Sequence, residues 1–224
     1  MSFVELMVVI SMIVIIATIA MPGLLSSRIT ANEAATIQVL RAIVAAEATI
    51  RSRQTIETDA IGNGEGEYAY LAELGGQVLL RGTATYVDPP LLSAKLGLIR
   101  SGAANSSGYM FAMFLPGALG VGIPEDPAGG KADPSVLDST LAERLWVAYA
   151  WPAEMGKSGR RAFVVNQSGD ILATNNGEPG QGYSGRTAGP AFDAAFSAPG
   201  DISQRLAFQP GVLGQDGGRW LPLR

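Results

Sequence analysis

Twenty consecutive uncharged residues near the N-terminus, Leu6–Leu25, constrain this chain more than any other feature. Most of them are Leu, Ile, Val, Met or Ala, and at about 1.5 Å per residue a helix of this length spans roughly 30 Å, the thickness of a bilayer's hydrocarbon core. Glu5 stands at the start of the run, and the first basic residue is Arg28. A secretory signal peptide would instead open with basic residues, carry a shorter apolar core and end at a small-residue cleavage site. The run therefore predicts a helix that is long and apolar enough to span a membrane.

An amphipathic pattern continues this helix beyond the apolar run. At 100° per residue, one face gathers the apolar residues Ile29, Ile37, Val39, Leu40, Ile43, Val44 and Ile50. Three charged residues fall nearer the centre of this stripe and interrupt it: Glu33, Glu47 and Arg51. The i, i+4 spacing of the last two is worth about 0.2–0.5 kcal/mol. We expect one helix from about Ser2 to Gln54, with its second half packed on the sheet of a head domain.

The first ten residues, Met-Ser-Phe-Val-Glu-Leu-Met-Val-Val-Ile, resemble the mature N-terminus of type IV pilins and pseudopilins. The motif of that family reads Phe-Thr-Leu-Ile-Glu-Leu and is followed by an apolar helix. Glu5 falls at the family's fifth mature position and Pro22 at its helix-bending proline, so two spaced markers agree in register. Met1 stands where the family usually has Phe, and Val14 where Gly is common. The resemblance covers residues 1–55 and is only general beyond them. Because the basic leader ending in Gly is absent, we expect the processed chain.

The resemblance implies an α+β fold, in which a long N-terminal α-helix packs on an antiparallel β-sheet head. It also implies a structural major subunit of an extracellular type IV pilus-like helical filament on the cell surface, of the kind used in adhesion or motility, and not an enzyme. The resemblance implies identical subunits as partners in a helical homopolymer, and the cytoplasmic membrane as the anchor before assembly. It also implies contact with prepilin peptidase and the pilus assembly machinery. Subunits of this family undergo N-terminal methylation.

Four residues carry the assembly hypothesis: Met1, Glu5, Pro22 and Gly23. A carboxylate inside a membrane-grade helix costs about 2.5–3.5 kcal/mol at the bilayer centre and less near an end, so Glu5 needs a partner. The resemblance supplies one, the α-amino group of residue 1 in an adjacent subunit. Pro22 lacks an N–H and Gly23 has low helix propensity, so the pair interrupts the helix internally.

The chain contains no Cys and no His, which excludes several classes of site. Disulfides, Cys/His zinc sites, haem on a His, and Ser-His or Cys-His nucleophile pairs are all ruled out. The formal charge of −4 gives no broad electrostatic reason to bind nucleic acid. The acidic loops match no EF-hand pattern, and we interpret their charge as solvating. These loops lie at Glu57-Asp59, Glu65-Glu67, Glu125-Asp126 and Asp170. We expect no catalytic, cofactor-binding or metal-binding residues.

The chain divides into an apolar helix half at 1–25, an amphipathic half at 26–54 and a head at 55–224. Alternating apolar residues predict strands at Tyr109–Leu115 and Leu145–Trp151, and a hairpin of Arg161–Val165 with Ile171–Thr174. Helical turns are expected at Tyr68–Leu74, Leu91–Leu96 and Val136–Glu143, among long loops. From about Asn175, breakers alternate with apolar residues, which predicts an extended, ordered C-terminal tail wrapped over the head or a neighbouring subunit.

Two further patterns have structural interpretations. Trp146, Tyr149 and Trp151 lie on one predicted strand and are expected to pack in the core of the head. Lys157, Arg160 and Arg161 form a small basic cluster that is typical of a solvated sheet end, and the preceding Gly156 indicates a hairpin turn.

Two alternatives to the pilus subunit stay open. One is a major pseudopilin of a type II secretion system, which builds a short periplasmic fibre. The larger head and long apolar tail favour the pilus. The other is a membrane-tethered enzyme or binding protein, but a simple tether needs neither Glu5 nor an amphipathic continuation to Arg53.

Overall fold

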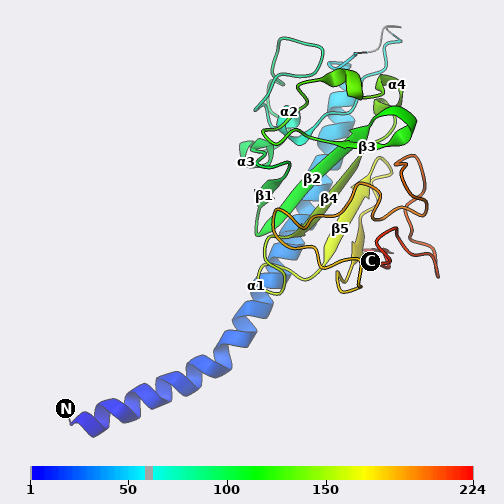
Figure 1. Cartoon of the computed structure of the whole chain (residues 1–224). Helices are drawn as coiled ribbons and strands as arrows, with labels where there is room; N and C mark the ends of the chain where they lie inside the picture. The colour runs from blue at the N-terminus through cyan, green and yellow to red at the C-terminus, as the bar shows by residue number, and fades with distance from the viewer. Residues whose placement is uncertain (1, 59–62, 224) are drawn as a thin grey trace.

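A computed structural model describes residues 2–58 and 63–223. One long helix, α1 (Phe3–Arg53), runs along the head with its C-terminal half and projects beyond it with its N-terminal half (Figure 1). Ser2 caps its start, and Gln54 ends it in the left-handed region at φ 52°. The expected helix, Ser2 to Gln54, is therefore confirmed.

The head is built on a seven-stranded antiparallel sheet, which confirms the α+β class. The strands are β1 (Ala104–Ser106), β2 (Tyr109–Pro116), β3 (Gly122–Pro124), β4 (Val147–Pro152), β5 (Ala162–Asn166), β6 (Leu172–Thr174) and β7 (Leu221–Pro222). Their order in the sheet is β1-β2-β4-β5-β6-β7, and β3 pairs with the end of β2. Short helical turns connect them: α2 (Leu71–Leu74), α3 (Ala94–Gly97), η1 (Ala118–Gly120), η2 (Pro134–Val136) and α4 (Ser139–Ala142).

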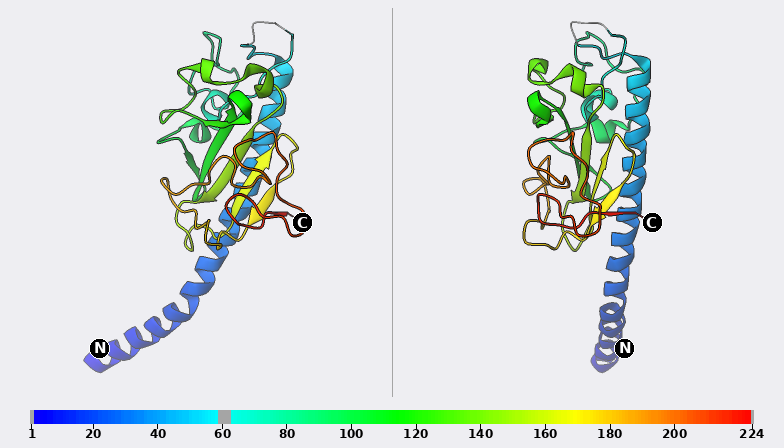
Figure 2. Two further views of the ribbon diagram at one scale, coloured as in Figure 1. Left: turned by 45° about the vertical axis from the view of Figure 1, so that its right-hand side comes forward. Right: turned by 90° about the vertical axis from the view of Figure 1, so that its right-hand side faces the viewer.

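The two faces of the sheet carry two separate cores because strand side chains alternate. The face toward α1 packs Phe111 and Phe163 with Leu40, Ile43 and Ile50 of the helix. The other face packs alternate residues of the same strands, such as Tyr149 and Val164, under side chains of the C-terminal segment that include Phe196 and Trp220. Figure 2 shows this layering in its right-hand view, with α1 on one side of the strands and the C-terminal loops on the other. The predicted tail therefore wraps over its own head.

Three short strands differ from the expectation. β1, β3 and β7 have three residues or fewer, so they are too short to show an alternating pattern. The strand predicted at Tyr109–Leu115 was expected to end before Pro116, but β2 includes this proline and pairs it with Gly122 of β3. A proline fits at this position because it ends the strand, where its missing N–H is not needed, while its carbonyl accepts the N–H of Asp138 at 3.0 Å.

The charged residues that interrupt the apolar stripe fasten α1 to the head. The Glu33 carboxylate accepts the backbone N–H groups of Arg160 and Arg161 at 3.1 and 3.2 Å. The Glu47 carboxylate accepts the N–H of Ala69 at 3.0 Å. The expected Glu47–Arg51 pair is wrong, because burial turns Glu47 toward the backbone of the head while Arg51 pairs with Glu65 at 3.4 Å.

Candidate functional site

The N-terminal half of α1 exposes a continuous apolar surface. Its large apolar side chains, from Phe3 to Leu25, are between 40% and 75% exposed where their placement is described. By length and composition this helix can cross a membrane, and none of its most apolar window, with a mean hydropathy of 2.7, is buried against the head. A contiguous apolar surface of this size marks a surface that lipid or other protein covers.

Glu5 lies at the start of this surface and closes the first turn of its own helix. Its Oε2 accepts the backbone N–H of Ser2 at 2.7 Å, while the Ser2 hydroxyl accepts the N–H of Val4 at 3.4 Å. The two residues form a capping box, which satisfies backbone donors that the helix leaves free. A carboxylate offers about four acceptor positions, so this cap leaves capacity for an amine from another chain.

The capping box is a feature that the reasoning from the sequence missed. Ser-Phe-Val-Glu at residues 2–5 fits the Ser-x-x-Glu pattern that precedes an apolar run, and that pattern could have identified it. Met1, the expected amine donor, lies outside the described residues.

Pro22 and Gly23 lie inside α1, whose helical backbone continues through both. Figure 1 shows that the projecting half leaves the head at an angle to the docked half. Hydroxyl groups in this region donate to carbonyls one turn earlier: Thr18 to Val14 at 2.6 Å and Ser27 to Gly23 at 3.0 Å. Such contacts satisfy the hydroxyls internally, as a lipid environment requires, and they favour helix bending.

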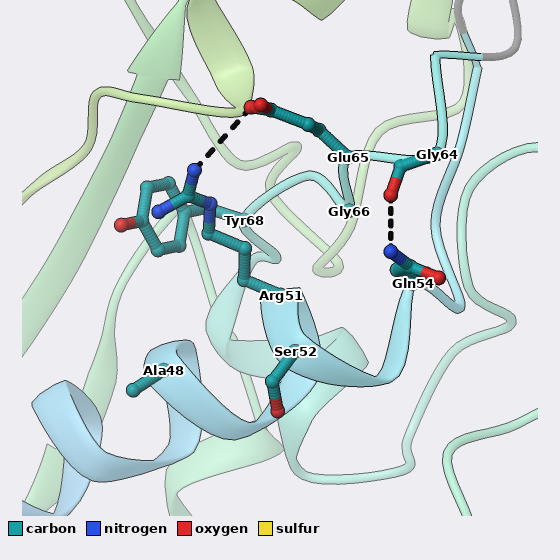
Figure 3. A pocket seen from close by; sticks show the side chains of 8 residues that line it. All are labelled: Ala48, Arg51, Ser52, Gln54, Gly64, Glu65, Gly66 and Tyr68. Atoms are coloured by element: carbon teal, nitrogen blue, oxygen red, sulfur yellow. Dashed lines mark hydrogen bonds and ion pairs between the residues drawn. The ribbon is translucent and has the colours of Figure 1, made fainter.

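A hollow at the other end of α1 is lined by Arg51, Gln54, Gly64 and Tyr68, among others (Figure 3). Its polar groups already bind one another. The Arg51 guanidinium pairs with Glu65 at 3.4 Å and lies 5.6 Å from the centre of the Tyr68 ring, and the Gln54 amide donates to the Gly64 carbonyl. The hollow brings together no pair of groups suited to acid–base chemistry.

Several acidic and basic residues considered from the sequence are paired within the chain. Asp126 accepts from Lys131 at 2.8 Å, Lys157 pairs with Glu154, and Arg161 pairs with Glu33 at 2.7 Å. Over residues 2–58 and 63–223, the side chains of Asp and Glu form no group of three or more that could hold a metal ion. Asp59, one of the acids named above, lies outside these residues.

The aromatic side chains of β4 and its flank pack inside the head, as expected. Trp146 contacts Tyr68 on the helix side of the sheet, with ring centres 6.1 Å apart. Tyr149 contacts Trp220 on the other side at 6.0 Å. These rings stabilise the two cores.

Compared with models of protein families, with curated proteins and with solved structures, the chain has no significant match. The fold and the exposed helix define the class of protein: an α+β head carried on a long apolar N-terminal helix. This arrangement is compatible with a pilin-like fold, and the helix is consistent with a transmembrane segment.

Proposed function

We propose that the protein is a structural subunit of an extracellular helical filament of type IV pilin character, assembled through α1. The observation that carries the proposal is an exposed apolar helix half, with a single carboxylate at its start, that continues without a break into a helix fixed to the head. Before assembly the same half anchors the subunit in the cytoplasmic membrane. After processing by prepilin peptidase, the assembly machinery transfers it to a bundle of like helices.

The attachment of α1 to the head favours a filament subunit over a tethered enzyme or binding protein. Asn32 donates to the Ser158 carbonyl at 2.8 Å, and Glu33 accepts from Arg161 at 2.7 Å, so contacts at the base of the head hold the helix where it emerges. A tether needs only length and apolar character. A subunit in an ordered array also needs its head fixed to the helix that packs against its neighbours.

Packing against like helices can replace lipid on the exposed half. Lipid is as apolar as these side chains, so close approach and dispersion contacts favour association, and small residues such as Ala17 and Ala31 permit that approach. In the proposed filament, one surface of α1 docks on a different surface of its neighbour, which is a heterologous interface. A heterologous interface that does not close produces an open helical array.

Sheared surface fibres test the proposal. Cells that produce the protein should yield fibres in negative-stain microscopy, and mass spectrometry of those fibres should identify this chain as the main component. Cells lacking the gene provide the control. Recovery of the chain only from membranes, with no fibres, would reject the proposal. Short fibres confined to the periplasm would instead identify a pseudopilin of a type II secretion system.

A further inference from the structure

A buried segment of the head is held by carboxylates rather than by neighbouring strands. Every residue from Gly66 to Gly75 is buried, and only four of them are helical. Three backbone N–H groups of this segment donate to Glu side chains: Ala69 to Glu47 at 3.0 Å, Tyr70 to Glu73 at 2.7 Å and Ala72 to Glu125 at 2.8 Å. The three carboxylates come from α1, from α2 and from the loop after β3, so they join these elements at one place.

The buried charges around this segment do not balance. Glu47, Glu73 and Glu125 are each at most 3% exposed. Arg81, 5% exposed, is a buried cation that pairs directly with Glu73, while its charge acts on Glu47 and Glu125 from a greater distance. The Arg81 guanidinium pairs with Glu73, with Nε 3.1 Å from Oε1, and donates to the Tyr68 carbonyl, while its Nη1 has no hydrogen-bond partner. Glu47 and Glu125 therefore have no salt bridge of their own within the described part of the chain. We call Glu47, Glu73, Arg81 and Glu125 the buried carboxyl cluster.

One oxygen of each of these two acids has no hydrogen-bond partner. In Glu47, Oε2 accepts the N–H of Ala69, while the buried Oε1 has no hydrogen-bond partner. In Glu125, Oε1 accepts the N–H of Ala72, while the buried Oε2 has no hydrogen-bond partner. An ionised, unpaired carboxylate is far more costly to bury than a neutral carboxylic acid. A proton on each unpartnered oxygen would remove that cost and preserve the bond to the backbone.

The surroundings agree with bound protons. Burial raises the pKa of Glu125 to about 8. The backbone N–H groups of Ala72 and Gly130 and the charge of Arg81 oppose this rise, and the nearby Glu73 carboxylate reinforces it. Burial likewise raises the pKa of Glu47 well above its usual range, opposed by the N–H of Ala69 and then by Arg81, with Glu73 and Glu125 adding to the rise.

Other charged or titratable groups border the cluster. Glu67 lies 3.8 Å from Arg81, and its own carboxylate accepts from Thr58. The Tyr70 hydroxyl donates to the Ile123 carbonyl, and Asp126 is paired with Lys131. None of these supplies a second cation to Glu47 or Glu125.

We propose that the buried carboxyl cluster is a proton-linked latch between α1 and the head: with Glu47 and Glu125 protonated it holds the segment Gly66–Gly75 against the helix, and their ionisation loosens that segment. The latch belongs to the head and does not depend on the filament function proposed above.

The sign of the pH dependence follows from the direction of the shifts. A carboxyl whose pKa is higher in the folded state than its usual 4.5 binds its proton more tightly when folded. The resulting stabilisation is complete below about pH 4.5 and is lost as the pH rises through about 8. The pKa is lowered at three other acids, Asp126, Asp133 and Asp201. Their contribution to the stability of the fold is lost only as the pH falls below their usual 3.8, which is outside the range from pH 4.5 to about 8.

The test is urea unfolding of the full chain in detergent micelles, followed by a head signal such as Trp fluorescence, from pH 5 to pH 9. The unfolding midpoint of the wild type should fall across this range. Glu125→Gln and Glu47→Gln should each flatten the fall, because the amide oxygen keeps the backbone bond and the NH₂ replaces the protonated oxygen. Glu65→Gln, at an exposed pair with Arg51, should change nothing. A wild-type midpoint that is constant or rises would overturn the latch.

Two measurements on the wild type keep the test decisive if a variant fails to fold. Infrared absorption should show protonated carboxyl groups in the folded chain at pH 7, and these should disappear as the pH is raised above about 8. As the pH rises through about 8, hydrogen exchange at the backbone N–H groups of Ala69 and Ala72 should accelerate by at least about tenfold more than the intrinsic effect of pH. A tenfold change corresponds to a shift of one pKa unit. Folded protein with no protonated carboxyl at pH 7 would contradict the proposal.

Discussion

Glu33 and Arg161 lie 128 positions apart in the chain and join the base of the head to α1, with Oε2 of the acid 2.7 Å from Nε of the arginine. The other oxygen of Glu33 accepts the backbone N–H groups of Arg160 and Arg161. One carboxylate therefore binds both the side chain and the backbone at the point where β5 begins. This contact positions the projecting half of α1 relative to the sheet.

Replacing Glu33 by Ala should destabilise the head by about 1–2 kcal/mol, because two backbone N–H groups lose their acceptor while the partly exposed Arg161 can return to water. Glu33→Gln should cost less, since its amide oxygen still accepts. Urea unfolding in detergent measures both. Glu154→Ala is the matched control: it removes an exposed acid of the neighbouring turn and should leave the midpoint unchanged. Equal midpoints for Glu33→Ala and the wild type would refute the role given to this contact.

Gly66 permits the close approach of the chain to the end of α1 (Figure 3). A Cβ at this position would lie 2.3 Å from the Arg51 carbonyl oxygen and 2.9 Å from Cα of Gln54. Both are backbone atoms, so neither can turn away. Gly66→Ala should therefore destabilise the head by about 1–3 kcal/mol, the usual cost of overpacking.

Thermal unfolding measures this effect, with Gly177→Ala as the control. Gly177 is exposed, and an added Cβ there meets only the Asn175 carbonyl at 4.0 Å, so the control should unfold with the wild type. A Gly66→Ala protein as stable as this control would show that the end of α1 can shift to accept a methyl group.

Periodicity was sufficient to predict α1, β2, β4 and β5, because each is long enough to repeat its pattern. β6 has only three residues and was predicted from the turn that joins it to β5. Periodicity was insufficient for β1, β3 and β7, whose few residues become strands through pairing with neighbours already in place. The polar residues were harder still. Glu33 and Glu47 looked like defects in the stripe, since the backbone N–H groups that they bind come from segments 22 or more residues away.

The residues of the candidate assembly site could be predicted from the sequence, whereas the buried carboxyl cluster could not. Glu5, Pro22 and Gly23 follow from local sequence, and the structure places all three on one continuous helix. The capping contact of Glu5 with Ser2 was also readable locally. The buried carboxyl cluster was not, because its members at positions 47, 73, 81 and 125 converge only after the helix, the buried segment and the loop after β3 have packed together.

Replacing Glu5 by Ala should leave membrane insertion intact and abolish fibres. The charge costs energy in lipid, and on our proposal a neighbour's amine offsets that cost only in the filament. Microscopy of sheared fibres, with detection of the chain in membranes, measures both effects. Glu5→Gln should lose less, because its amide oxygen still accepts a hydrogen bond.

The capping box requires a further control, since Glu5→Ala also removes a cap worth about 1 kcal/mol. Ser2→Ala removes the Ser2 hydroxyl from the cap while leaving the Glu5 carboxylate in place. It should retain fibres if the carboxylate acts between subunits. Loss of fibres in Ser2→Ala equal to that in Glu5→Ala would assign the effect to the cap instead, and abundant fibres from Glu5→Ala would reject the intersubunit role.

The free chain keeps α1 helical through Pro22 and Gly23, and we expect assembly to change this. In an ideal helix, a proline at position 22 leaves the Thr18 carbonyl without an N–H donor, a defect of about 3 kcal/mol, and a glycine at position 23 weakens the helix by up to about 1 kcal/mol. In lipid the exposed backbone would be costly, so the helix is retained there with a bend.

In a filament, neighbouring protein can cover the freed backbone groups, and extension lets each subunit reach its partner's amine. Residues Val14–Gly23 should therefore lose regular helical bonding, while the chain before Val14 and Leu24–Gln54 stay helical. The double variant Pro22→Ala, Gly23→Ala restores the missing N–H and raises helix propensity, so it should insert normally and give fewer or shorter fibres. A filament structure with unbroken i to i−4 bonding through Thr18–Leu25, apart from the bond that Pro22 cannot make, would rule out this transition.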